Sequence, residues 1–172
     1  SLYGAKLLSK HFVVFLFFFI SGIFFYLILR KIVENEDFCI LALIIYLTYP
    51  YLFGQSMFSP KDVPFLSIWV VCTFLSFNLL EKIIDEKTIN IKSVLIFSLV
   101  TSYLVSIRIA VILIFLQYFF LLVLYLSIYK KNKIQFLKNF YFKITTFIIG
   151  TVILTFLLNP IFFIEPSLII TT

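Results

Sequence analysis

Lys61 and Asp62 form a charged pair in a chain that is otherwise poor in charge, and their types and spacing could do chemistry. They lie within residues 53–65, a short polar segment between two long apolar runs. The segment also contains one glycine and two prolines, which disfavour helix interiors, so we expect the chain to turn here. A charged pair at such a turn is costly in a membrane unless it lies in a polar cavity or at an interface. It therefore marks a candidate site.

The same segment also has a purely structural interpretation. The side chain of Ser59 or Asp62 can cap the helix that follows, with Pro64 in the first turn of that helix. Asp62 would then orient Lys61 or cap the helix, and we do not expect it to act as a catalytic base.

Arg108 is the other charge with long apolar sequence on both sides, and Asn159 precedes a proline at the end of a late apolar run. The chain has no glycine-rich phosphate loop, no metal-ligand spacing and no nucleophile elbow. We therefore expect no metal site and no cofactor. Cys39 and Cys72 both fall inside apolar runs, so we interpret them as small buried hydrophobic residues.

The composition indicates a membrane protein. Of 172 residues, 63% are hydrophobic and only 13% are charged, and the mean hydropathy is +1.15, whereas soluble domains contain about 25% charged residues. In lipid, backbone polar groups must be satisfied within helices or closed barrels. The apolar runs have helical lengths, so we predict one all-α transmembrane domain over residues 1–172. The net charge of +6 comes from lysines in short loops and does not predict nucleic-acid binding.

Six apolar segments predict transmembrane helices, at about residues 12–29, 38–53, 64–80, 93–107, 109–128 and 144–158. The fourth and fifth belong to one run, residues 93–129, interrupted only by Arg108. A single helix over this run would be about 55 Å long, against a bilayer core of about 30 Å. We therefore predict a tight helical hairpin that turns at Arg108.

The distribution of basic residues predicts an orientation. With six spans, one side of the membrane holds the loops 30–37, 81–92 and 130–143, which together contain ten of the fourteen Lys and Arg residues. The positive-inside rule places this side in the cytoplasm. Polar groups from four distant segments then lie on the extracytoplasmic side, as an outward-facing active site requires: Lys6, Lys10, His11, Lys61, Asp62, Arg108, Asn159 and Glu165. The alternative is that these residues simply belong to polar loops.

Three tracts resemble a known family. Residues 53–54 and 59–65 read Phe-Gly and Ser-Pro-Lys-Asp-Val-Pro-Phe. They resemble the Phe-Gly…Asn-Pro-Lys-Asp-Ile-Pro-Phe signature of bacterial dolichyl-phosphate-mannose-protein-mannosyltransferase-like membrane proteins, in the GT-C glycosyltransferase superfamily. Residues 106–109, Ser-Ile-Arg-Ile, are similar to a family tract that closes a short span. Residues 158–160, Leu-Asn-Pro, look like the family's late Asn-Pro turn, and the order and spacing of the three tracts agree.

The resemblance implies transfer of a sugar from a polyprenyl-phosphate donor to an unknown acceptor at the outer face of a membrane, expected to be the bacterial inner membrane. Lys61 and Arg108 are the residues we expect to bind the donor phosphate, because a cation can neutralise the phosphate that leaves. Arginine offers a planar fork and lysine a point charge. Asp62, Ser59 and Asn159 are expected to support this site. Membrane lipid is the other expected partner.

The catalytic aspartate of the family lies in a large loop after the first span, and this chain resembles the family from the end of that loop onward. We therefore expect the chain to be an internal fragment of a longer membrane protein, with the catalytic base upstream of Ser1.

Two other functions are compatible with the apolar helices. One is a segment of a polytopic transporter or flippase, and the other is a structural membrane subunit without catalysis. An acidic pair after one more upstream span would favour the transferase, whereas an inverted repeat of these spans would favour transport. Acidic residues are absent from the middle of the predicted spans, which disfavours ion-coupled transport.

Overall fold

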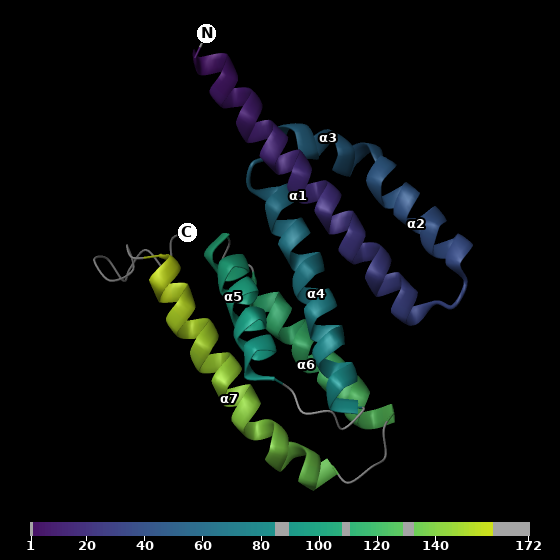
Figure 1. Ribbon diagram of the computed structural model, residues 1–172, viewed down its shortest axis with the longest axis vertical. Helices are drawn as coiled ribbons and strands as arrows, with labels where there is room; N and C mark the ends of the chain where they lie inside the picture. The colour runs from purple at the N-terminus through teal and green to yellow at the C-terminus, as the bar shows by residue number, and fades with distance from the viewer. Residues whose placement is uncertain (1, 85–89, 108–110, 129–132, 160–172) are drawn as a thin grey trace. The chain divides into compact units, whose positions relative to one another are not determined.

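The computed structural model describes residues 2–84, 90–107, 111–128 and 133–159. The secondary-structure elements within these ranges are all α-helices (Figure 1). The seven helices of these ranges are α1 (Leu2–Ile32), α2 (Glu36–Thr48), α3 (Pro50–Phe58), α4 (Asp62–Ile84), α5 (Ile91–Ile107), α6 (Ile112–Ile128) and α7 (Lys133–Leu158). The predicted all-α class is thus confirmed.

The helices form two compact units, Ser1–Phe74 and Leu75–Thr172. Helix α4 contributes its first part to the first unit and its remainder to the second. Each unit has its own packing, and each is described by itself.

In the first unit, α1 packs on α2 around the ring of Tyr46. This ring stacks on Phe25, with 4.6 Å between ring centroids, and on Phe18 at 5.4 Å. Its hydroxyl is 2.9 Å from Oγ of Ser21, which is fully buried. A polar group in an apolar interface is thereby satisfied, and the hydrogen bond fixes the register of the two helices.

The predicted second span, residues 38–53, is not one straight helix. Helix α2 ends at Thr48 and α3 begins at Pro50, and the two helices are bent by 49°. Pro50 has no N–H to continue the α2 ladder, but it fits the first position of a new helix. The chain therefore breaks at Tyr49.

The predicted turn over residues 53–65 is shorter than expected. Helix α3 continues through Gly54 to Phe58, and α4 begins at Asp62. Only residues 59–61 lie between the two helices. A glycine lowers helix stability by about 1 kcal/mol relative to alanine but does not forbid a helix.

In the second unit, α5 and α7 lie side by side (Figure 1). Gly150 of α7 faces Ser98 of α5, and a Cβ atom on Gly150 would be only 3.1 Å from Oγ of Ser98. The rings of Phe97 and Phe147 stack next to this point, with 4.6 Å between centroids. Small residues let the two backbones approach, and aromatic rings fill the space beside them.

The break predicted in the long apolar run is confirmed. Helix α5 ends at Ile107 and α6 begins at Ile112. The Tyr118 hydroxyl of α6 lies 3.3 Å from Oγ1 of Thr101 on α5, so the two helices contact each other. Arg108, the residue predicted at the tip, lies outside the described residues.

The predicted number of six spans is not confirmed. Among the described residues, three helical segments are long and apolar enough to cross a membrane: Leu8–Ile32, Asp62–Lys82 and Tyr141–Leu158. The bent pair α2–α3 brings the number to four if it counts as one span. Helices α5 and α6 have 17 residues each, or about 26 Å. They are slightly short for a core of about 30 Å.

The lysine-rich segment 130–143, predicted as a loop, is helical from Lys133 onward. Lysine is a good helix former, and the segment contains no glycine or proline to stop a helix. The first turns of α7 therefore contain Lys133, Lys138 and Lys143, and an uncharged run follows from Ile144.

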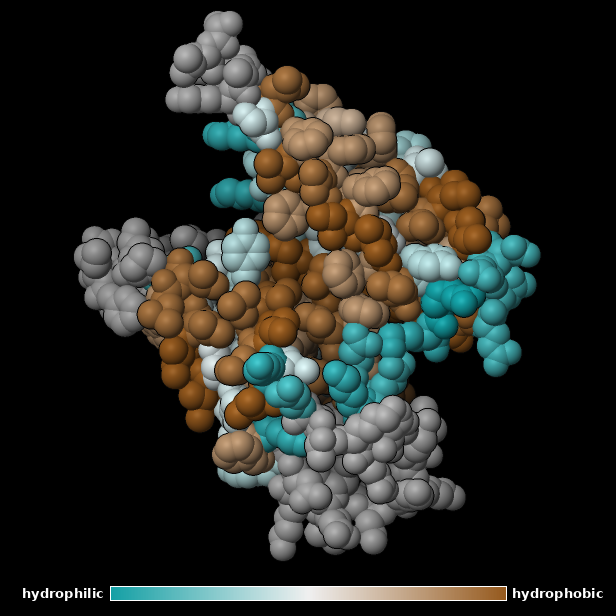
Figure 2. Space-filling model, viewed as in Figure 1, coloured by the Kyte–Doolittle hydropathy of each residue, from teal (hydrophilic) through white to brown (hydrophobic). Residues whose placement is uncertain are grey.

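The surface of the described residues is largely apolar. Figure 2 shows hydrophobic side chains over most of the face in view, with hydrophilic side chains gathered in a few patches. On α6, Leu116, Phe119 and Phe120 expose 64%, 67% and 58% of their surfaces. Apolar surface of this extent is typical of proteins that contact lipid, not water.

Candidate functional site

The residues predicted for the site fall into one group in each unit. The first group is the α3–α4 junction, Phe58 to Asp62, in the first unit. The second is the α5–α7 end, formed by Ser106 and Asn159 in the second unit. Each group is held by hydrogen bonds that follow from its own sequence.

Ser59 ends one helix and starts the next. Its backbone N–H donates to the carbonyl oxygen of Gln55 at 2.8 Å, which closes α3. Its side-chain Oγ accepts from the backbone N–H of Asp62 at 3.2 Å, which caps α4. The capping interpretation of Ser59 is therefore confirmed.

Asp62 completes this cap. The Ser59 hydroxyl donates to Oδ2 of Asp62 at 2.9 Å, so the two side chains and the Asp62 backbone form one closed arrangement. The carboxylate also lies in the first turn of α4, where the helix dipole favours negative charge. Pro64 lies in the same first turn, where no intrahelical partner for an N–H is needed.

Lys61 occupies the short connection between the two helices and its side chain is exposed. Its backbone carbonyl accepts from the N–H of Phe65 at 3.1 Å, so the start of α4 fixes its main chain. The result is a cation on a rigid backbone next to an apolar helix.

His11 lies against the end of α3. Its ring meets that of Phe58 edge-on, with 6.2 Å between centroids. Helix α1 thus passes the end of α3 within the first unit. No sequence signal pointed to this contact, because it depends on how two distant helices pack.

Asn159 joins the ends of α7 and α5. Its side-chain Nδ2 donates to Oγ of Ser106 at 2.6 Å and to the carbonyl oxygen of Thr155 at 3.1 Å. Ser106 in turn donates to the carbonyl oxygen of Ser102 at 2.9 Å. Two of the tracts singled out in the sequence, Ser-Ile-Arg-Ile and Asn-Pro, are therefore in contact.

The sequence contains a signal for close packing at this end of α5. Ser98, Ser102 and Ser106 are spaced by four residues and lie on one face of α5. A row of small polar residues in an apolar helix indicates close helix packing. It does not reveal which helix packs there.

Arg108 and Glu165 lie outside the described residues, whereas Ser59, Lys61, Asp62 and Asn159 lie within them. The junction brings together Ser59, Lys61 and Asp62.

The other titratable residues form no metal site within the described ranges, where no group of three His, Cys, Asp or Glu side chains could hold a metal ion. Cys39 and Cys72 are both fully buried, which confirms their interpretation as small buried hydrophobic residues.

No protein family, no curated protein and no solved structure matches this chain. A functional interpretation must therefore come from the residues themselves and from their geometry.

Proposed function

We propose that this chain is part of a GT-C-type membrane glycosyltransferase that transfers a sugar from a polyprenyl-phosphate donor at the extracytoplasmic face. The observation that carries the proposal is the 2.6 Å hydrogen bond between Asn159 and Ser106. It joins two tracts, far apart in sequence, that both resemble the same family. If the two tracts resembled the family only by chance, there would be no reason to expect them to be in contact.

In this proposal the donor phosphate is bound by Lys61 and Arg108. The lipid tail of such a donor lies in the bilayer and its phosphate at the headgroup level. Lys61 is exposed and directly precedes the apolar segment Asp62–Lys82. In this proposal its ammonium group therefore lies at the depth of the donor phosphate. A fixed cation stabilises the negative charge that develops on the leaving phosphate.

Ser106 and Asn159 have a positioning role in this proposal. Arg108 follows Ser106 by two residues in the chain. The bonds from Asn159 to Ser106 and from Ser106 to Ser102 tie the end of α5 to α7. They fix Ser106, which precedes Arg108 in the same tract, and a fixed supporting residue can favour a phosphate contact without touching the substrate.

The test is sugar transfer from a synthetic polyprenyl-phosphate sugar by the full-length protein in detergent, at matched protein levels. Lys61→Ala and Arg108→Ala each remove a charge-assisted contact of about 1.5–3 kcal/mol, which is roughly 10- to 150-fold in rate. Arg108→Lys is expected to restore only part of the rate, because the fork geometry is lost.

Lys92→Ala is the matched control, since Lys92 is an exposed lysine at the start of α5 and belongs to neither group. It should transfer sugar at the wild-type rate. Wild-type rates in both Lys61→Ala and Arg108→Ala would remove these residues from the site and refute the proposed mechanism.

A transporter or flippase segment is the second candidate, and the 49° bend between α2 and α3 favours it. Broken helices line the substrate site of many transporters. The two functions are separated by reconstituting the full-length protein into sealed vesicles. A transferase should turn over the donor without moving substrate across the membrane, whereas a transporter or flippase should move substrate.

A further inference from the structure

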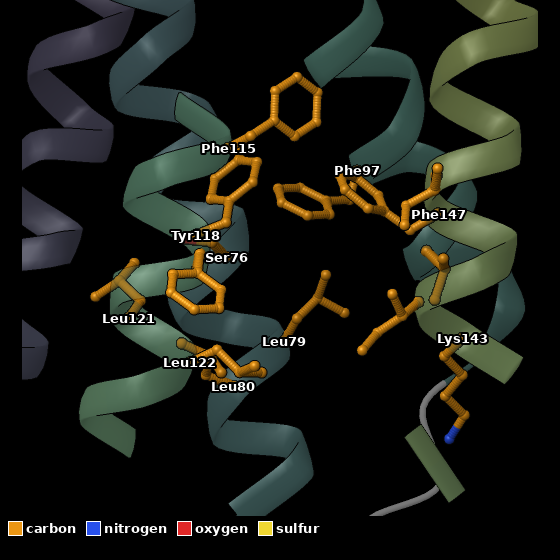
Figure 3. A pocket seen from close by; sticks show the side chains of 14 residues that line it. Ser76, Leu79, Leu80, Phe97, Phe115, Tyr118, Leu121, Leu122, Lys143 and Phe147 are labelled. Carbon is orange, nitrogen blue, oxygen red and sulfur yellow. The ribbon is translucent and has the colours of Figure 1, made fainter. Parts of the chain in front are cut away.

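The second unit contains a cavity that the proposed function does not use. It has a volume of about 340 Å³ and is lined by 14 residues of α4, α5, α6 and α7, all from residue 76 onward. Figure 3 shows Leu79 between the aromatic rings of the cavity and Lys143. The volume is at the lower end of the range for ligand pockets, about 300–1,000 Å³, and suits a single narrow chain.

Packed aromatic rings form one wall of this cavity. Phe97 stacks on Phe147 at 4.6 Å and lies 5.0 Å from the Tyr118 ring, measured between centroids. The Tyr118 hydroxyl is 3.3 Å from Oγ1 of Thr101, so its polar end has a partner and its ring remains to line the cavity. The wall is apolar and fixed by packing before any ligand binds.

One cationic residue, Lys143, lines the cavity. The stem of its side chain is part of the lining, and Figure 3 shows its nitrogen pointing away from the aromatic rings. The cavity is therefore apolar inside and has a cation at one end.

The position of Lys143 along α7 matches the headgroup level of a bilayer. The uncharged run of α7 begins directly after Lys143, at Ile144, and the side chain of the nearby Tyr141 is 70% exposed. Tyrosine and lysine at the start of a span are typical of the membrane–water interface. From Lys143 the lining continues along the same helix through Ile144, Phe147 and Ile148, in the direction of the bilayer core.

We propose that this cavity binds one acyl chain of an anionic phospholipid, with the lipid phosphate bound by Lys143. The apolar wall suits the acyl chain, and the cation at one end suits the negative headgroup. Because Lys143 lies at the start of the apolar part of α7, the headgroup would lie at that end and the acyl chain would extend toward the bilayer core. Basic pockets between transmembrane helices commonly bind anionic headgroups in this way. The site is at the opposite end of α7 from Asn159 and does not depend on the proposed transferase activity.

The test is lipid binding to the delipidated full-length protein, measured by native mass spectrometry. The probes are dioleoyl phosphatidylglycerol, dioleoyl phosphatidylcholine and an undecaprenyl phosphate. Wild-type protein should bind one phosphatidylglycerol at least fivefold more tightly than phosphatidylcholine. Lys143→Gln should reduce that preference to below twofold, and the control Lys92→Gln should leave it unchanged, because Lys92 does not line the cavity.

Leu79→Trp fills the cavity and should weaken both phospholipids at least fivefold. If this variant fails to elute as a single folded species, Leu122→Phe provides the same test with a smaller change. Equal wild-type affinity for the two phospholipids, or phosphatidylglycerol binding that survives either Lys143→Gln or cavity filling, would overturn the proposal. Tighter binding of undecaprenyl phosphate than of phosphatidylglycerol, lost in Lys143→Gln, would overturn it in favour of a polyprenyl site.

Discussion

Hydroxyl groups in these apolar helices mostly hydrogen-bond to their own helix. Ser102 donates to the carbonyl oxygen of Leu99, and Thr151 donates to that of Phe147. Such bonds satisfy a buried hydroxyl without any partner from another helix. Asn159 differs because its amide reaches α5, and a bond between helices can fix how they pack.

The Asn159–Ser106 bond should show energetic coupling. Asn159→Ala and Ser106→Ala each remove it, so the double variant should be less destabilised than the sum of the two. Hydrogen bonds between membrane helices contribute about 0.6 kcal/mol and at most about 1.7 kcal/mol. The coupling is measured from equilibrium unfolding in detergent micelles as a double-mutant cycle.

Ser127→Ala is the matched control for that cycle, because the Ser127 hydroxyl is exposed and donates only to the Val123 carbonyl of its own helix. Its coupling to Asn159→Ala should be zero within error. A coupling between Asn159 and Ser106 that is no larger than this control would show that the two ends are not held together.

The Ser59 cap gives a second prediction for single residues. Ser59→Ala removes the acceptor for the Asp62 N–H and should lower the free energy of unfolding by about 1 kcal/mol. Ser59→Asn should restore most of it, since asparagine caps as well as serine. Asp62→Asn should cost about 1 kcal/mol or less and keep sugar transfer. Loss of transfer in a folded Asp62→Asn protein would assign the carboxylate a chemical role.

Among the elements, α5 and α7 are held closest together where Gly150 meets Ser98. Ser98 is fully buried, and its Cβ would lie 3.3 Å from a Cβ added to Gly150. Its hydroxyl also donates to the carbonyl oxygens of Val94 and, at 3.3 Å, of Phe147. This side chain cannot turn away without losing both bonds, so the helices themselves would have to separate.

Gly150→Ala should therefore destabilise the protein by about 1–3 kcal/mol, the usual cost of overpacking. Gly54→Ala is the matched control in another helix, because no atom lies within 4 Å of the position of its Cβ. It should be neutral or stabilise the protein by up to about 1 kcal/mol through helix propensity. Unfolding midpoints in detergent that shift in the same direction for both variants would contradict the close approach of α5 and α7.

Those parts of the fold that depend on local sequence could be predicted. The ends of α5 at Ile107 and of α7 at Leu158 match the predicted spans, and the Ser59 cap joins residues three apart. Two local signals indicate a turn or loop where the structure has a helix, namely Gly54 in α3 and the lysines near Lys133 in α7. The contacts of His11 and Asn159 could not be predicted, since they depend on which helix faces which.

On the scale of the whole molecule, the orientation stays a prediction from the positive-inside rule, and it does not require that α5 and α6 cross completely. Helices α5 and α6 contact each other and are both short, so we expect the chain to return to the side from which it entered. We then expect Lys133, at the start of α7, on the same side as Lys92. Whether the loop near Glu34 lies on that same side depends on whether the bent pair α2–α3 crosses the membrane or forms a re-entrant loop.

Single cysteines at Glu34, Phe58 and Lys92 test this orientation, because all three side chains are exposed. Cys39 and Cys72 are first replaced by alanine; both are fully buried and small. From outside intact cells, an impermeant maleimide should label position 58 only, and after permeabilisation all three. Labelling of both 34 and 58 from one side would make α2–α3 a re-entrant loop, and labelling of 92 but not 58 from outside would reverse the orientation.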